Sequence, residues 1–159
     1  MPVFIRTLDN LARITEKVAA HAGTRKIEPA VLRNYRLYPD RLPFSKQIQV
    51  ATDMAKGCAA RLAGQEPVKF EDNEVSFPEL LARIAKTVDY LKTLRPEQID
   101  GSEEKSITLK MRTGPRTFTG LKYLLDFAYP NFYFHVTTAH DILRHCGVEI
   151  GKMDFLGRT

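Results

Sequence analysis

The residues with the clearest capacity for chemistry lie in residues 119–146, which hold three of the chain's four histidines among many aromatic residues. His135, His140 and His145 are spaced by five, so successive rings diverge by about 140° around a helix and cannot all bind one metal ion. Asn131 and His135 are four apart and share a helix face. A helical wheel adds small and apolar residues to this line: Ala128, Ala139, Ile142 and Cys146. We therefore expect His135 to point into the core, His140 to face solvent and His145 to lie near the helix end.

A second polar pair lies on the helix expected over residues 45–63. Gln49 and Asp53 are one turn apart at the edge of its apolar stripe. If this edge faces the interior, Asp53 becomes a polar partner for His135 and the two could serve as an acid–base pair; otherwise Asp53 is a solvated helix residue. Bundles place ligand sites between facing helices, so we expect a polar pocket lined by Gln49, Asp53, Asn131 and His135. A hydrogen-bonded network that leaves no room for a ligand is the alternative interpretation.

The composition favours an ordinary globular protein with one domain, residues 1–159. Hydrophobic residues make up 43% and charged residues 27% of the chain. The net charge of +5 comes from basic residues scattered among acids, so we expect no nucleic-acid partner. No apolar run approaches the roughly 20 residues of a membrane helix, and Arg6 and Asp9 interrupt the N-terminal stretch that a signal peptide would need to be apolar. We therefore expect a cytoplasmic protein without a membrane partner.

The remaining motifs identify no reaction. Cys58 and Cys146 lie among apolar residues of expected helices and are not spaced as C-x-x-C, which favours free thiols over a disulfide. The sequence contains no glycine-rich phosphate loop, G-x-S-x-G elbow or H-E-x-x-H metal helix. Whether the protein is an enzyme is therefore left open.

Four amphipathic helices are expected to position these residues, over residues 4–22, 45–63, 77–94 and 119–146. The first ends where Gly23 can adopt the left-handed conformation. The third begins at a capping box, in which Ser76 and Glu79 satisfy free backbone N–H groups of the first turn. Each helix carries an apolar face, and these faces can be buried only against one another.

Two of the segments that connect these helices have patterns that predict their structure. Residues 106–119 alternate between apolar and polar around a Thr-Gly-Pro turn, which predicts a short β-hairpin. Residues 24–43 form a long connection with tyrosines and prolines, expected to cover the core rather than to form a lid or a dimer contact. The fold class is therefore all-α: an up-and-down four-helix bundle with a short β-hairpin before the last helix. Whether Pro130 kinks that helix or divides it is left open.

Three stretches of the chain resemble the DinB/YfiT-like superfamily of bacterial helical bundles, and within it an uncharacterised domain-of-unknown-function family. They are PFSKQIQVATDMAKGCAARLAG, KFEDNEVSFPELLARIAKT and TFTGLKYLLDFAYPNFYFHVTTAHDILRHCGVEIGKMDFLG. The resemblance implies a four-helix bundle that is frequently a homodimer. It also implies a zinc or nickel ion held by three histidines, one on the second helix and an H-x-x-x-H pair on the last. Some relatives are thiol-dependent transferases or isomerases.

The chain departs from that ligand pattern. The histidine pair falls at Asn131 and His135, and the second helix has no histidine, so Gln49 or Asp53 would stand at the matching place. Amides are poor ligands for zinc or nickel, which leaves His135 and Asp53 as the candidates for a weak, degenerate site. We therefore expect a small-molecule binding protein with a polar pocket around His135. The alternatives are a non-catalytic dimeric interaction bundle and a metal-dependent enzyme resembling thiol transferases.

Overall fold

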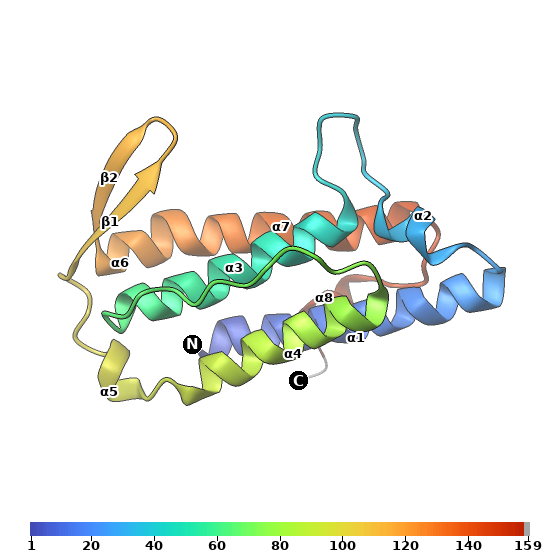
Figure 1. The fold of residues 1–159 in the computed structure, drawn as a ribbon. Coiled ribbons are helices and arrows are strands. Elements are labelled where there is room, and N and C mark those ends of the chain that lie inside the picture. Colours follow the sequence, from blue (N-terminus) through green and yellow to red (C-terminus); the bar gives the residue numbers. More distant parts are fainter. Residues whose placement is uncertain (158–159) are drawn as a thin grey trace.

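Four long helices form the bundle in the computed structural model, which describes residues 1–157 (Figure 1). They are α1 (Pro2–Arg25), α3 (Phe44–Leu62), α4 (Phe77–Thr93) and α7 (Tyr129–His145). Shorter elements join them: α2 (Pro29–Arg33), α5 (Pro96–Ile99), β1 (Ser106–Met111), β2 (Gly114–Thr119), α6 (Gly120–Lys122), the π-helix η1 (Tyr123–Ala128) and α8 (Lys152–Leu156). The expected all-α bundle with a β-hairpin ahead of the last long helix is confirmed.

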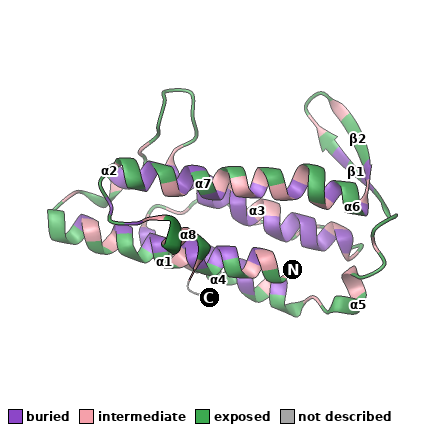
Figure 2. Cartoon of the chain, turned by 180° about the vertical axis from the view of Figure 1, so that it is seen from behind, coloured by how far each residue is buried: buried purple, intermediate pink, exposed green. Residues whose placement is uncertain are grey.

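The apolar faces of the long helices meet along the bundle axis, and Figure 2 shows the buried residues on their facing sides. The apolar stripe of each helix, read from its helical periodicity, is buried on α1 (Phe4, Leu8, Leu11, Thr15 and Val18) and on α3 (Ile48, Ala51, Thr52, Ala55, Ala59 and Leu62). On α4 the stripe is also buried, except that Leu81 is half-buried. No helix within residues 1–157 is long and apolar enough to cross a membrane.

The two middle helices run in the same direction. The ring of Phe44, at the start of α3, lies 6.2 Å from the ring of Phe77, at the start of α4. The connection over residues 63–76 therefore returns along the length of α3 before α4 begins (Figure 1). Helix α7 runs opposite to α3, because its beginning lies near the end of α3, where Arg61 donates to Tyr123. The chain direction thus alternates between α1 and α3 and between α4 and α7, but not between α3 and α4.

Helix α1 continues past the expected end at Gly23. It ends at Arg25, and Lys26 adopts the left-handed conformation with φ 55°. The Ile27 N–H donates to the Ala22 carbonyl at 2.9 Å, and Ile27 packs against the core. This is the bond and apolar contact of a Schellman ending, which here outweighs the steric preference for glycine at the left-handed position.

Pro130 neither ends the last helix nor divides it. Helices α6, η1 and α7 are continuous, and the π-helical segment comes directly before Tyr129. Proline has no N–H for the carbonyl four residues earlier, and a wider turn at that point accommodates the missing bond. The Asn131 side chain donates to the Phe127 carbonyl at 2.6 Å, which supplies a donor close to the proline.

Candidate functional site

His135 lies at the seam between α7 and α3, where its ring is oriented by Gln47. Its Nδ1 is 2.7 Å from Gln47 Oε1. The Gln47 Nε2 donates to the Leu42 carbonyl at 2.8 Å, which assigns the other amide atom, Oε1, as the acceptor. His135 Nδ1 therefore carries the proton in the neutral ring, and Nε2 holds a lone pair. Nε2 makes no hydrogen bond to any residue within 1–157 and is not enclosed, so it can accept one from a bound molecule.

The surroundings keep the His135 ring neutral. Burial lowers the pKa of His135 below its usual value, and the positive charge of Arg41 lowers it further. The guanidinium of Arg41 lies 5.1 Å from the ring centre of Phe134, which is 45% exposed. The Phe134 and His135 rings meet edge to face at 5.2 Å. The site therefore combines a hydrogen-bond acceptor, a cation and an exposed aromatic face.

The expected orientation of His135 toward the core is wrong. The buried side of α7 consists of Phe132, Val136, Ala139, Ile142 and Leu143, whereas Asn131 and His135 are half-buried at its edge. Phe132 makes edge-to-face contact with Phe4 of α1 at 4.8 Å. Ala139 and Ile142 of the expected line are buried as expected, but the bulkier side chain of Phe132 occupies the centre of the buried side. Large apolar side chains have the most area to bury, so the helix is turned with His135 at the edge of that side.

The other two histidines of α7 also have defined surroundings. His140 does not face solvent as expected, because Phe155 of α8 covers its ring edge to face at 6.0 Å. Its side chain is only 13% exposed, and its Nδ1 lies 3.1 Å from Asp141. His145 is exposed at the end of α7, as expected, and its ring packs on Tyr35 at 5.7 Å.

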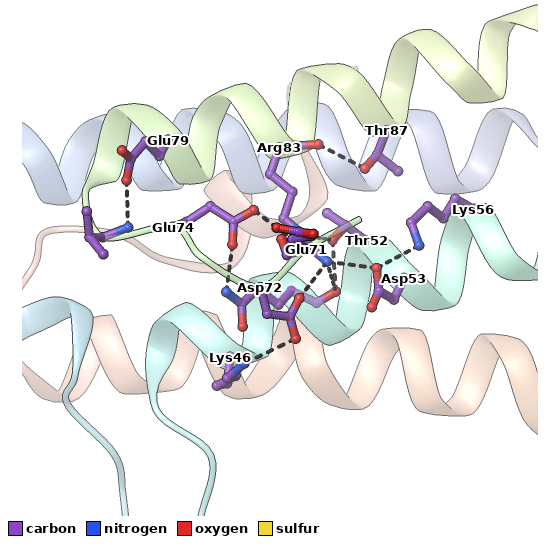
Figure 3. A network of polar contacts seen from close by, with 12 residues as sticks. Lys46, Thr52, Asp53, Lys56, Glu71, Asp72, Glu74, Glu79, Arg83 and Thr87 are labelled. Carbon is purple, nitrogen blue, oxygen red and sulfur yellow. Dashed lines mark hydrogen bonds and ion pairs between the residues drawn. The ribbon is translucent and has the colours of Figure 1, made fainter. Parts of the chain in front are cut away.

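Gln49 and Asp53 do not lie beside His135. They face α4: Gln49 donates to Glu74, and Asp53 pairs with Arg83 in the polar network of Figure 3. Asp53 Oδ1 accepts from Arg83 at 2.7 Å and forms an ion pair with Lys56 at 2.8 Å. The structure therefore distributes the four expected pocket residues over three places: Gln49 and Asp53 at Arg83, Asn131 at the π-helix, and His135 at Gln47. Ligand binding by these residues stays a prediction.

The Arg83 network fastens the returning connection over residues 63–76 to the bundle. Its guanidinium is 1% exposed and donates to the Glu71 carbonyl and to Glu74 Oε1, both at 2.9 Å. It also pairs with Asp72 at 3.0 Å and donates to Thr52 of α3 at 2.8 Å. The planar guanidinium has five donors, so one side chain can join α3, α4 and the connection between them.

Glu74 completes this network from the connection. It accepts from Gln49 Nε2 at 2.6 Å as well as from Arg83. Burial by itself would raise the pKa of the Glu74 carboxyl. The hydrogen bonds from Arg83 and Gln49, a backbone hydrogen bond and the positive charge of Arg83 outweigh it and hold the pKa below its usual value. The network is therefore at full strength while Glu74 is ionised.

Two of the residues that build these sites, Gln47 and Arg83, were missed by the sequence-based expectations. Gln47 lies three residues after Phe44 and four before Ala51, so it falls on the buried side of α3. Arg83 lies three residues after Leu80 on the buried side of α4. A polar residue at such a position must have a partner, and this is the signal that could have found both.

The residues present do not fit a three-ligand metal site of the kind the resemblance implies. Within residues 1–157, no three histidine, cysteine, aspartate or glutamate side chains are placed to hold one ion. His135 Nδ1 is engaged by Gln47, and the Asp53 carboxylate is engaged by two cations. Burial raises the pKa of Cys58 to about 12, which keeps this thiol protonated.

Comparison with known proteins gives one family and a close structural likeness. The model of a family described as a domain of unknown function, DUF1993, matches residues 1–156. The crystal structure of a DinB family member protein from Shewanella denitrificans is 39% identical, covers 98% of this chain and 88% of its own, and superposes with a TM-score of 0.92. No curated protein matches the chain.

Proposed function

The chain belongs to the DUF1993 family of DinB-like proteins, and we propose that it binds a small molecule at His135. The observation that carries the proposal is the orientation of a neutral imidazole whose Nδ1–H is held by Gln47 while Nε2 stays open. Metal-ligating histidines are usually held through one ring nitrogen in the same way. Within residues 1–157 the ring belongs to no cluster of three potential metal ligands, so we propose that the open nitrogen accepts a hydrogen bond from an organic ligand.

The neighbours of His135 suggest the chemical class of this ligand. The Arg41 guanidinium favours a carboxylate, because its planar donors match the two oxygens. The exposed ring of Phe134 offers a stacking surface beside it. Nε2 requires a hydroxyl, amine or thiol hydrogen. The proposed ligand is therefore a small aromatic acid that also carries a hydrogen-bond donor.

This proposal is tested by nuclear magnetic resonance of the ¹⁵N-labelled protein, titrated with 4-hydroxybenzoate. We expect His135 to be the Nδ1–H tautomer and to titrate below pH 6.5, because burial and Arg41 disfavour the charged ring. We also expect shift changes at His135, Phe134 and Arg41, and tighter binding as pH rises through the His135 pKa, since only the neutral ring accepts at Nε2.

The control for this experiment is a second histidine on the same helix. His135→Phe is expected to abolish the 4-hydroxybenzoate shifts, whereas His145→Phe at the exposed helix end is expected to leave them unchanged. If 4-hydroxybenzoate caused no shift changes around His135, the proposal that this site binds a small aromatic acid would be rejected. Near-stoichiometric zinc or nickel in untagged protein, lost in His135→Ala, would replace the proposal with the metal-dependent thiol transferase-like alternative.

A second candidate is association of two copies of the chain through the connection between α2 and α3. This connection projects from the bundle on the same side as the hairpin (Figure 1). It exposes Leu37, Tyr38 and Leu42, and its Arg41 lies over the exposed ring of Phe134. Tyrosine and arginine side chains are enriched among the residues that carry most of the binding energy at protein interfaces. The proposed homodimer would cover this cluster.

Sedimentation equilibrium tests the second candidate. If two copies associate here, Tyr38→Glu is expected to weaken the dimer at least about tenfold, because a buried carboxylate without a partner is costly. Val75→Glu is a matched control, since Val75 is 68% exposed and Tyr38 is 66% exposed. A monomer at all concentrations, or equal weakening by both variants, would contradict association through this connection.

A further inference from the structure

We propose that a hollow between the end of α3 and the hairpin binds a small anion carrying two or more phosphate or carboxylate charges. The hollow has a volume of about 540 Å³, which suits a small molecule. Arg61, Lys105 and Lys110 line it, against one acid, Glu66. It lies at the opposite end of α3 from Gln47 and His135, so it is separate from the site proposed above.

The three cations lack acidic partners. Within residues 1–157, none of them forms an ion pair. Arg61 donates to the hydroxyl of Tyr123 at 3.0 Å, and Lys105 donates to the Leu62 carbonyl at 3.2 Å, so both are held by neutral oxygens. An oriented cation whose charge is not compensated by the protein is free to bind an oxyanion.

The last carbonyl groups of α3 are all hydrogen-bonded, so the end of this helix repels an anion less than a helix C-terminus usually does. A helix C-terminus carries partial negative charge on its free carbonyl groups. Here Gly64, with φ +75°, turns the chain so that its N–H and that of Gln65 donate to the Arg61 and Ala60 carbonyls. Lys105 engages the Leu62 carbonyl. A Cβ atom at position 64 would lie 2.5 Å from the Lys105 Nζ, so glycine also leaves room for the ammonium group.

Strand β1 supplies the opposite wall. Ser106, Thr108 and Lys110 alternate with the buried Ile107 and Leu109, so they share the outward face of the strand. The hydroxyl of Ser106 adds a neutral donor to the lining of the hollow, and Lys110 adds charge farther along the strand. The hollow therefore combines charge with neutral donors, which is the combination that holds phosphate and carboxylate oxygens.

Isothermal titration calorimetry with sodium pyrophosphate and with sodium citrate tests this inference, at about 0.15 M salt, where weak long-range attraction is screened. We expect one site per chain with affinity tighter than about 1 mM for at least one of the two anions. Tighter binding of pyrophosphate would indicate a phosphate-bearing natural ligand, and tighter binding of citrate a carboxylate-bearing one. His135→Phe is expected to leave this affinity unchanged, which separates the hollow from the His135 site.

Charge-matched variants locate the binding. The pair Lys105→Gln and Lys110→Gln is expected to weaken binding about tenfold or more, because both residues line the hollow and carry a positive charge. The pair Lys92→Gln and Lys152→Gln removes the same charge from exposed positions elsewhere and is expected to change it less than about twofold. Lys110→Gln alone is also expected to weaken binding. Because the Lys110 side chain makes no hydrogen bond in the described chain, this variant should fold normally, so a loss of binding cannot be attributed to misfolding. No binding of either anion, or equal weakening by both pairs, would overturn the inference.

Discussion

Replacing Arg83 by alanine is expected to lower the free energy of unfolding by about 3–5 kcal/mol, the usual cost of removing one side of a buried ion-pair network. The Arg83 side chain is 1% exposed, and its loss leaves the Glu74 carboxylate, whose side chain is 10% exposed, without its cation. It also releases the Glu71 carbonyl and Asp72 on the connection over residues 63–76. The effect is measured by urea denaturation followed by circular dichroism.

Lysine is expected to restore little of this stability, because an ammonium group cannot reach α3 and the connection at once with the geometry of a guanidinium. Arg95→Ala, at an exposed position after α4, is the matched control and is expected to change stability by less than about 0.5 kcal/mol. A loss below about 1 kcal/mol for Arg83→Ala would mean that the connection is held by its other contacts.

The same network predicts an acid dependence whose sign follows from Glu74. Its pKa is lower in the folded chain than its usual value of 4.5, so the folded state prefers the ionised form. The stabilisation is therefore complete above the unfolded pKa and is lost as the pH falls through the folded pKa, that is, below about 4.5. Arg83→Ala should remove this part of the acid dependence.

Replacing Phe132 by alanine is expected to cost about 3–5 kcal/mol, the usual range for a large aromatic residue in a packed core. Phe132 is fully buried and lies edge to face against Phe4, which joins α7 to α1. His135→Ala removes a half-buried ring with one hydrogen bond to Gln47 and is expected to cost no more than about 1.5 kcal/mol.

Phe134→Ala is the matched control for Phe132→Ala, since it deletes the same side chain two residues away. Phe134 is 45% exposed, and we expect a loss of less than about 1 kcal/mol. If Phe134→Ala cost as much as Phe132→Ala, or if His135→Ala cost more than both, α7 would have to be turned so that His135 faces the core.

Much of the architecture follows from local features of the sequence. The capping serine, Ser76, begins α4 as expected, with its hydroxyl accepting from the Glu79 N–H. The alternation of Ile107 and Leu109 with polar residues yields the hairpin. Hydrophobic periodicity specifies which side of a helix is buried, and short-range capping specifies where it begins, because both depend on residues within one or two turns.

The partners of the polar residues were decided by tertiary structure alone. Periodicity placed Asp53 at the edge of a buried stripe but could not tell whether that edge faces α4 or α7. The edge of α3 that carries Asp53 faces α4 because the connection over residues 63–76 returns along α3. This connection brings the start of α4, and with it Arg83, beside the start of α3. His135 therefore has Gln47, and not Asp53, as its hydrogen-bond partner.

The sequence by itself determined the apolar faces of α1, α3 and α4, the hairpin and the departure from a three-histidine ligand set at Asn131 and His135. Only the tertiary structure decided that α3 and α4 run in the same direction, that Arg83 joins them, and that the unpaired cations near Lys105 line one hollow. The physical reason is range: local patterns act between residues a few positions apart, whereas Arg83 and Asp53 are separated by 30 positions and His135 and Gln47 by 88.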